Sequence, residues 1–210
     1  LLGANGAGKT TLMRMICDVQ TETKGAIMLN GKNIHDLGEQ YRNILGYLPQ
    51  HFGYYPNFTA YKFLMYIAAI KGLPHQKAHK RSLELLEKVG LSEQKNVKIK
   101  TFSGGMKQRL GIAQALLNNP KILILDDSTS AVDTKTDYLI RKAFREDIPE
   151  TTKIIISQRI SSIQDAQRII VLDDGHISGI GTHDELLKNN PIYQEVYETQ
   201  VKGGAENENE

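Results

Sequence analysis

The chain has 210 residues, of which 40% are hydrophobic and 24% are charged, a composition typical of a globular protein with a sizeable core. The 26 Lys and Arg residues nearly balance the 24 Asp and Glu residues, so the net charge of +2 does not indicate nucleic acid as the main partner. The single cysteine, Cys17, excludes an internal disulfide and a cysteine metal cluster, as expected in a reducing compartment.

The chain begins at Leu1 rather than at Met and enters a glycine-rich segment, residues 3–8, without a basic and apolar signal sequence. We therefore interpret the sequence as a fragment. A helical pattern follows the glycines. After the apolar run at 26–29, the pair Asn30-Gly31 predicts a tight hairpin.

The middle of the chain is predicted to be mainly helical, after a strand at 44–48. Thr59 is a suitable cap for a helix over residues 60–70, and a charged helix runs from about His75 to Val89. The longest apolar stretch, Phe63 to Ile70, is much shorter than the roughly 18 residues that cross a bilayer. We do not expect this chain to span a membrane by itself.

The last part alternates helical and strand patterns. After the turn Ser103-Gly104-Gly105, a helix is predicted to run toward Asn118. Strands are predicted after it at residues 122–125, 154–156 and 169–172. This alternation predicts an α/β fold in which helices flank a mostly parallel sheet. The Glu- and Asn-rich tail at 203–210 is predicted to be disordered.

The glycine-rich segment is a phosphate-binding loop by its spacing. Residues 3–10 read Gly-Ala-Asn-Gly-Ala-Gly-Lys-Thr and match the pattern GxxxxGK[ST] at every fixed position. Such a loop curves backbone N–H groups around phosphate at a helix N-terminus, while Lys9 neutralises the terminal phosphates and Thr10 holds Mg²⁺. The predicted nucleotide-binding residues are Asn5, Gly6, Ala7, Gly8, Lys9, Thr10 and Thr11.

Two acidic residues follow the apolar strand at 122–125. Asp126 and Asp127 lie where an unpaired charge is costly, so a cation is expected near them. With a phosphate loop upstream, Asp126 is suited to Mg²⁺ and Asp127 to the water that attacks the terminal phosphate. The sequence therefore predicts ATP and Mg²⁺ as cofactors.

These motifs resemble those of the ATP-binding-cassette (ABC) family of P-loop NTPases, and the resemblance covers nearly the whole chain. Residues 102–109 are similar to the family's signature motif, usually LSGGQ, just before a helix. The resemblance implies one ABC ATP-binding domain at 1–202, with a signature-bearing helical subdomain at about 57–118. The residues implied to face a nucleotide bound by a second cassette are Ser103, Gly104, Gly105 and Met106.

Three further positions match the family one by one. Gln50 resembles the Q-loop glutamine, which contacts Mg²⁺ and the attacking water. Asp133, in Ser-Ala-Val-Asp at 130–133, resembles the D-loop aspartate, although it is equally suited to capping the next helix. Gln158 aligns with the switch histidine. Together with the acidic pair after the strand, the resemblance implies catalytic roles for Asp127, Gln158 and Gln50.

Two departures from the family pattern weaken the same step. The usual catalytic glutamate is Asp127, which is one methylene shorter, and displacing a base by about 1 Å can reduce the rate on the order of 100-fold. The switch histidine is Gln158, which cannot become positively charged. This combination resembles the degenerate half of heterodimeric ABC exporters, so nucleotide binding is expected to persist while hydrolysis is slow or absent.

The resemblance implies an ATP-binding subunit or domain that drives export from the cytoplasmic face of the cell membrane. Its expected partners are a second ABC ATP-binding domain and a membrane-spanning transporter subunit, with no nucleic acid. The alternatives are a fully active homodimeric ATPase and a cassette that acts on ribosomes or DNA without transport. Segment 46–72 is more similar to separate ATP-binding subunits of antibiotic exporters, whereas the sequence after about Leu123 resembles fused exporters.

Two other groups of side chains have simpler interpretations. His75 and His79 are four residues apart on one predicted helix face, which favours a solvated face over a zinc site. Tyr54 and Tyr55 follow Gln50 and are interpreted as a contact with the membrane partner or as packing, rather than as an adenine-stacking pair.

Overall fold

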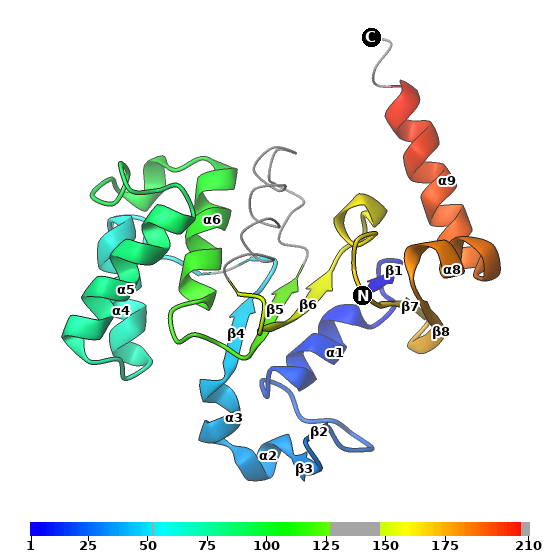
Figure 1. The fold of residues 1–210 in the computed structure, drawn as a ribbon, viewed down its shortest axis with the longest axis horizontal. Coiled ribbons are helices and arrows are strands. Elements are labelled where there is room, and N and C mark those ends of the chain that lie inside the picture. The colour runs from blue at the N-terminus through cyan, green and yellow to red at the C-terminus, as the bar shows by residue number, and fades with distance from the viewer. Residues whose placement is uncertain (52, 127–147, 207–210) are drawn as a thin grey trace. The chain divides into compact units, whose positions relative to one another are not determined.

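The computed structural model describes residues 1–51, 53–126 and 148–206 of the chain. It divides into two compact units, the first made of Leu1–Gln20 with Ile155–Glu210 and the second of Thr21–Ile154 (Figure 1). The division separates the phosphate-loop segment from the segment that carries the signature motif, and each unit has its own strands and helices.

The first unit is built on a small mixed sheet. Strand β1 (Leu2–Gly3) pairs in parallel with β7 (Ile169–Asp173), which pairs antiparallel with β8 (His176–Gly181). Asp174 and Gly175 turn the chain between β7 and β8 with φ values of 40° and 75°. The core of this unit consists of buried apolar side chains from β1, β7 and the elements around them: Leu2, Ile160, Ile163, Ile169, Val171, Leu186 and Tyr193.

Helices of the first unit lie at both ends of its sequence. Helix α1 (Lys9–Ile16) follows the phosphate-loop segment. The short 3₁₀ helix η2 (Ile160–Ser162), α8 (His183–Asn189) and α9 (Pro191–Glu206) come from the C-terminal part. Residues 203–206, the first half of the predicted disordered tail, belong to α9, because an established helix extends by one hydrogen bond for each residue added. The rest of that tail, 207–210, lies outside the described residues.

A capping box begins α8. The Thr182 hydroxyl accepts a hydrogen bond from the Glu185 amide at 3.4 Å, and the Glu185 carboxylate accepts one from the Thr182 amide at 2.8 Å. The bond from the Thr182 amide, with a second one that the Thr182 hydroxyl donates at 3.0 Å, lowers the pKa of Glu185 because both stabilise the ionised carboxylate. The pair satisfies backbone donors that the first helical turn leaves without intrahelical partners.

We expect Thr182→Ala to lower the free energy of unfolding by about 1 kcal/mol, because the capping hydroxyl is lost. Chemical denaturation measures the change. Thr182→Ser, which retains the hydroxyl, is the matched control and is expected to stay close to the wild type. Equal loss in both variants would show that the methyl group, rather than the hydroxyl, stabilises this end of α8.

The second unit contains a parallel sheet and a hairpin. Strand β4 (Leu45–Leu48) pairs in parallel with β5 (Ile122–Asp126), with Leu45 opposite Ile122 and Leu48 opposite Leu125. Strand β6 (Thr152–Ile156), in which the boundary between the units falls, lies on the other side of β5. The buried side chains of β5 explain why its sequence is apolar without alternation.

The hairpin precedes two short helices. Strands β2 (Met28–Leu29) and β3 (Lys32–Asn33) pair antiparallel across Asn30 and Gly31, which adopt φ values of 50° and 79°. This geometry confirms the hairpin that the Asn-Gly pair predicts. Helices α2 (Ile34–Leu37) and α3 (Glu39–Asn43) then lead into β4.

All regular elements between residues 57 and 118 are helical. They are α4 (Ala60–Ile70), α5 (His75–Lys88), the 3₁₀ helix η1 (Ile99–Thr101) and α6 (Gly104–Ala115). Thr59 caps α4 through a bond from the Lys62 amide, as its position predicts. Helix α6 ends at Ala115, before the predicted end near Asn118, and Asn119 has a φ of 47°, which helices do not continue through.

The C-terminal end of α5 is tied to α6 by one side chain. Arg109 of α6 donates from Nη1 to the carbonyl oxygens of Val89 and Gly90, both at 3.0 Å. These carbonyls follow the last turn of α5 and have no intrahelical donors. The guanidinium therefore fixes the helix that carries the signature motif to its neighbour.

Candidate nucleotide-binding site

The phosphate-loop segment has the backbone shape that an anion requires. Gly6 and Gly8 both have a φ of 88°, a conformation that L side chains rarely adopt, so glycine is needed at each position. Gly8 is the N-cap residue of α1 and supplies no capping side chain. The first amides of α1 are therefore available to oxygen atoms of a ligand, at the positive end of the helix dipole.

Lys9 is held inside the loop. Its ammonium donates to the carbonyl oxygens of Gly3 and Ala4, both at 2.7 Å, and the residue is only 8% exposed. The carbonyls orient the positive charge at the start of the helix beside the uncapped amides. Thr10 follows in the first turn and is exposed. These features fit the phosphate groups of a nucleotide, which need amide donors and a cation together.

Gln158 contacts the phosphate loop directly. Its side-chain amide donates to the Asn5 side-chain oxygen at 2.6 Å, which joins the segment after β6 to the loop within the first unit. Gln200 of α9 holds the same segment from the other side, since it donates to the Gln158 carbonyl at 2.6 Å and accepts from the Ile160 amide at 2.9 Å. The residue at the switch position is thus anchored at its backbone and its side chain.

We expect Gln200→Ala to loosen the segment that carries Gln158. Loss of an intramolecular hydrogen bond of about 1 kcal/mol predicts a rise of roughly fivefold in hydrogen exchange at the Ile160 amide. Gln194→Ala, which removes a bond to the Leu187 carbonyl, is the matched control on α9 and is expected to leave this amide unchanged. Unchanged exchange in Gln200→Ala would contradict the anchoring role.

The second unit brings Gln50 and Asp126 to one edge of its sheet. Leu48 and Leu125 are paired across β4 and β5, so Gln50 and Asp126 both follow the carboxyl ends of neighbouring parallel strands. Asp126 is 4% exposed, whereas Gln50 is exposed. This edge is where α/β folds bind ligands. The predicted catalytic residue Asp127 and the predicted D-loop residue Asp133 lie outside the described residues.

Ser103 opens α6 as the signature motif predicts. Its hydroxyl accepts a hydrogen bond from the Met106 amide at 3.2 Å. Ser103 and Gly104 are exposed, and Gly105 and Met106 are half-buried. A Cβ atom added to Gly105 meets no atom within 4 Å, so space remains above the first turn. This helix end presents a capped but accessible surface of the kind that accepts an anion from another molecule.

The two tyrosines after Gln50 make different contacts. The Lys107 ammonium lies 5.3 Å from the centre of the Tyr54 ring, which links the signature helix to the segment that follows Gln50. Tyr55 stacks on Phe58 with ring centres 4.9 Å apart and meets Tyr66 edge to face at 5.2 Å. Tyr55 is nevertheless 48% exposed, so the stack leaves an aromatic surface open.

Within the described ranges, no cluster of three or more His, Cys, Asp or Glu side chains is arranged to hold a metal ion. His79 forms a hydrogen bond with the Tyr61 hydroxyl at 2.8 Å, which accounts for its position on the α5 surface. No helix in the described part of the chain has both the length and the apolarity needed to cross a membrane.

The phosphate loop with its uncapped helix defines a nucleotide-binding domain of the P-loop class. The family model described as "ABC transporter" matches residues 1–130, more than half of the chain. The chain therefore belongs to the ABC transporter family, as its motifs predict.

Individual relatives agree with this assignment. The uncharacterized ABC transporter ATP-binding protein YxlF of Bacillus subtilis (strain 168) is 38% identical over 89% of the chain, which spans 62% of YxlF. The structure of a bacterial Atm1-family ABC exporter with ATP bound aligns with a TM-score of 0.84 and 28% identity, over 95% of this chain and 36% of the exporter. The dimeric cassette MJ0796 aligns with a TM-score of 0.75 and 29% identity, over 87% and 83% of the two chains.

Proposed function

We propose that the chain is the ATP-binding domain of an ABC exporter and that ATP binds to its phosphate loop. The proposal rests mainly on the arrangement of Lys9. Its ammonium is held by the Gly3 and Ala4 carbonyls at 2.7 Å beside the uncapped start of α1. Nucleotide phosphates replace these carbonyls as partners of the ammonium with little movement. The residues proposed to surround the phosphates are Asn5, Gly6, Ala7, Gly8, Lys9, Thr10 and Thr11.

We further propose that the domain hydrolyses ATP slowly. Mg²⁺, when bound, supplies charge neutralisation to the phosphates, and Thr10, Gln50 and Asp126 are the residues that would hold it. Asp127 accepts the proton of the attacking water but reaches less far than a glutamate. Gln158 donates a hydrogen bond through its amide without adding positive charge.

The proposed partner is a second ATP-binding domain, whose nucleotide would meet Ser103, Gly104, Gly105 and Met106. Support comes from the exposure of this helix start and from the similarity to the dimeric cassette MJ0796. Similarity to an ATP-bound exporter supports a membrane-spanning partner and a location at the cytoplasmic face of the membrane. We propose one ATP-binding domain at 1–202, with Asp133 in the segment that couples the two cassettes.

Steady-state phosphate release by the full-length protein tests the catalytic proposal. We expect Asp127→Glu to raise the rate about tenfold or more, because the longer side chain restores the reach of the base. Asp127→Asn is the matched control and is expected to lower the rate further while ATP still binds. Brisk wild-type turnover that Asp127→Glu leaves unchanged would contradict slow hydrolysis, and failure of ATP to bind the wild type would overturn the whole assignment.

A further inference from the structure

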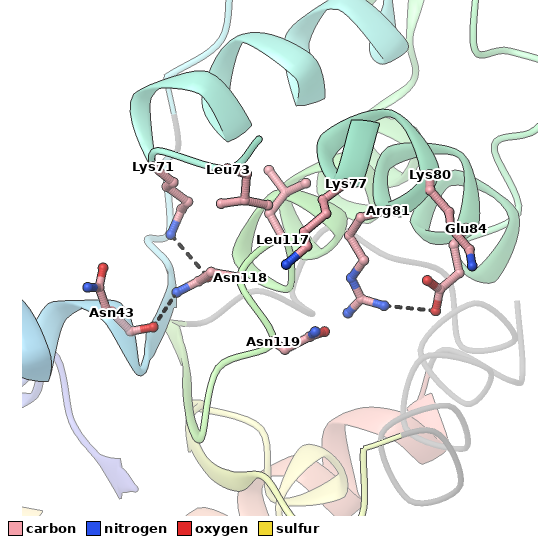
Figure 2. A pocket seen from close by; sticks show the side chains of 10 residues that line it. All are labelled: Asn43, Lys71, Leu73, Lys77, Lys80, Arg81, Glu84, Leu117, Asn118 and Asn119. Carbon is pink, nitrogen blue, oxygen red and sulfur yellow. Dashed lines mark hydrogen bonds and ion pairs between the residues drawn. The ribbon is translucent and has the colours of Figure 1, made fainter. Parts of the chain in front are cut away.

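A pocket of about 520 Å³ lies in the second unit among α4, α5, the end of α3 and the turn after α6 (Figure 2). Its volume falls within the roughly 300–1,000 Å³ of small-molecule sites. Leu73 and Leu117 form the apolar part of its wall. All lining residues lie between 43 and 119, so the pocket belongs to one unit and contains no residue of the phosphate loop.

The pocket is strongly basic. Four of its lining side chains are cationic, namely Lys71, Lys77, Lys80 and Arg81, and one, Glu84, is acidic. Glu84 already pairs with Arg81 at 2.8 Å and with Lys88 at 3.6 Å. The acid therefore does not compensate the remaining cations. Because this charge is concentrated in a concave surface, its attraction for anions is stronger than on a flat one.

Two of the cations hold the wall together. Lys71, at the C-terminal end of α4, donates to the Asn118 side-chain oxygen at 3.2 Å. Asn118 in turn donates to the Asn43 carbonyl at 2.7 Å, and Figure 2 shows these two bonds of Asn118. Arg81 donates to the Leu116 carbonyl at 3.1 Å. Burial lowers the pKa of Lys71 because it disfavours the charged form. An anion bound beside the ammonium has the opposite effect and stabilises the charged form.

Lys77 and Lys80 have no such structural role. Both are exposed, and no acidic or hydrogen-bonding partner for either ammonium lies within the described ranges. They stand with Glu84 on one side of α5, because residues three or four apart share a helix face. The opposite side of α5 buries Ser82 and Leu86. Two lysines are thus presented to the pocket by a helix that packing fixes from behind.

The start of α5 adds to the attraction. Pro74 occupies the N-cap position and forms no side-chain cap, so the amides of the first turn keep their hydrogen-bonding capacity. Lys77 lies within that first turn of a 14-residue helix. The positive end of the α5 dipole and the Lys77 ammonium therefore both attract an anion. The Arg81 Nε–H also has no acceptor in the described part of the chain, although it is buried.

We propose that this basic pocket is a second anion site, which binds a compound carrying two or more phosphate groups through Lys77 and Lys80. Lys71 and Arg81 form the rigid positive floor, and Leu73 and Leu117 contact the non-phosphate part of the ligand. The site goes beyond the ATP-binding function, because none of its residues belongs to the motifs that bind or cleave ATP.

Inorganic pyrophosphate is the first probe, measured by isothermal titration against the full-length protein carrying Lys9→Ala, which removes the phosphate-loop cation. We expect Lys77→Gln combined with Lys80→Gln to weaken pyrophosphate binding about tenfold or more. Lys62→Gln combined with Lys98→Gln changes the net charge equally at exposed positions outside the pocket, and is expected to have little effect. Thermal melting checks that both double variants remain folded.

A second arm of the experiment distinguishes the two sources of the phosphate groups, a soluble compound and a lipid headgroup. Vesicles of phosphatidylcholine with phosphatidylinositol 4-phosphate are sedimented with the same three proteins. If pyrophosphate binds and its binding requires Lys77 and Lys80, the ligand is a soluble compound. If only the vesicles bind, and their binding requires the same two lysines, the ligand is a lipid headgroup. Absence of both, or equal loss in the two double variants, overturns the proposal. Because Lys9 is replaced throughout, these outcomes do not depend on ATP binding at the phosphate loop.

Discussion

Replacing Lys9 with alanine is expected to weaken ATP binding by about 100-fold and to abolish hydrolysis, because charge-assisted hydrogen bonds to phosphate are strong. Lys9 is 8% exposed, and its ammonium is held at 2.7 Å from the Gly3 and Ala4 carbonyls. Removal takes the ammonium away from both carbonyls and leaves the loop without its cation. Titration of the full-length protein with ATP measures the affinity, and phosphate release measures the rate.

The matched control for Lys9 is Lys24, which is exposed and belongs to the other unit. Lys24→Ala removes the same charge and is expected to leave affinity within about twofold, since an exposed charge interacts weakly through water. A thermal melt distinguishes loss of binding from loss of fold. If Lys9→Ala bound ATP as tightly as the wild type, the phosphate loop would not be the ATP site.

Local signals in the sequence predict the parts of the structure that depend on neighbouring residues. The sequence predicts that Thr59 caps a helix and that a helix begins at the Ser103 turn, and each of the two hydroxyls accepts a bond from an amide three residues later. The Asn30-Gly31 hairpin follows from the backbone conformations that these residues tolerate. The phosphate loop is predictable for the same reason, because its shape is encoded in eight consecutive residues.

Contacts between distant residues could not be predicted in this way. Gln200 anchors the Gln158 segment across 42 positions of sequence, and no spacing rule points to it. The cations of the basic pocket come together only because the end of α4, the face of α5 and the turn after α6 meet. Strand β8, by contrast, could have been predicted from a local signal, although we did not predict it. The pair Asp174-Gly175, which precedes β8, indicates a hairpin in the same way as Asn30-Gly31 does.

The strand that leads to Gln50 contains a glycine with no room for a side chain. Gly46 lies in β4, and a Cβ atom added there falls 2.3 Å from the Ala115 carbonyl oxygen and 2.8 Å from Pro120 Cγ. Neither group is the end of a flexible side chain, so β4 must move away from the end of α6. Because β4 also pairs with β5, the shift strains the sheet edge where Gln50 and Asp126 lie.

We therefore expect Gly46→Ala to lower the free energy of unfolding by about 3 kcal/mol, at the upper end of overpacking effects. Urea denaturation of the full-length protein measures the loss. Gly53→Ala is the matched control, since a Cβ atom there meets nothing within 4 Å, and a change below about 0.5 kcal/mol is expected. Similar stability of both variants would mean that β4 and α6 are not packed as closely as the Gly46 contact requires. A displaced sheet edge also predicts slower phosphate release in Gly46→Ala under conditions where the variant remains folded.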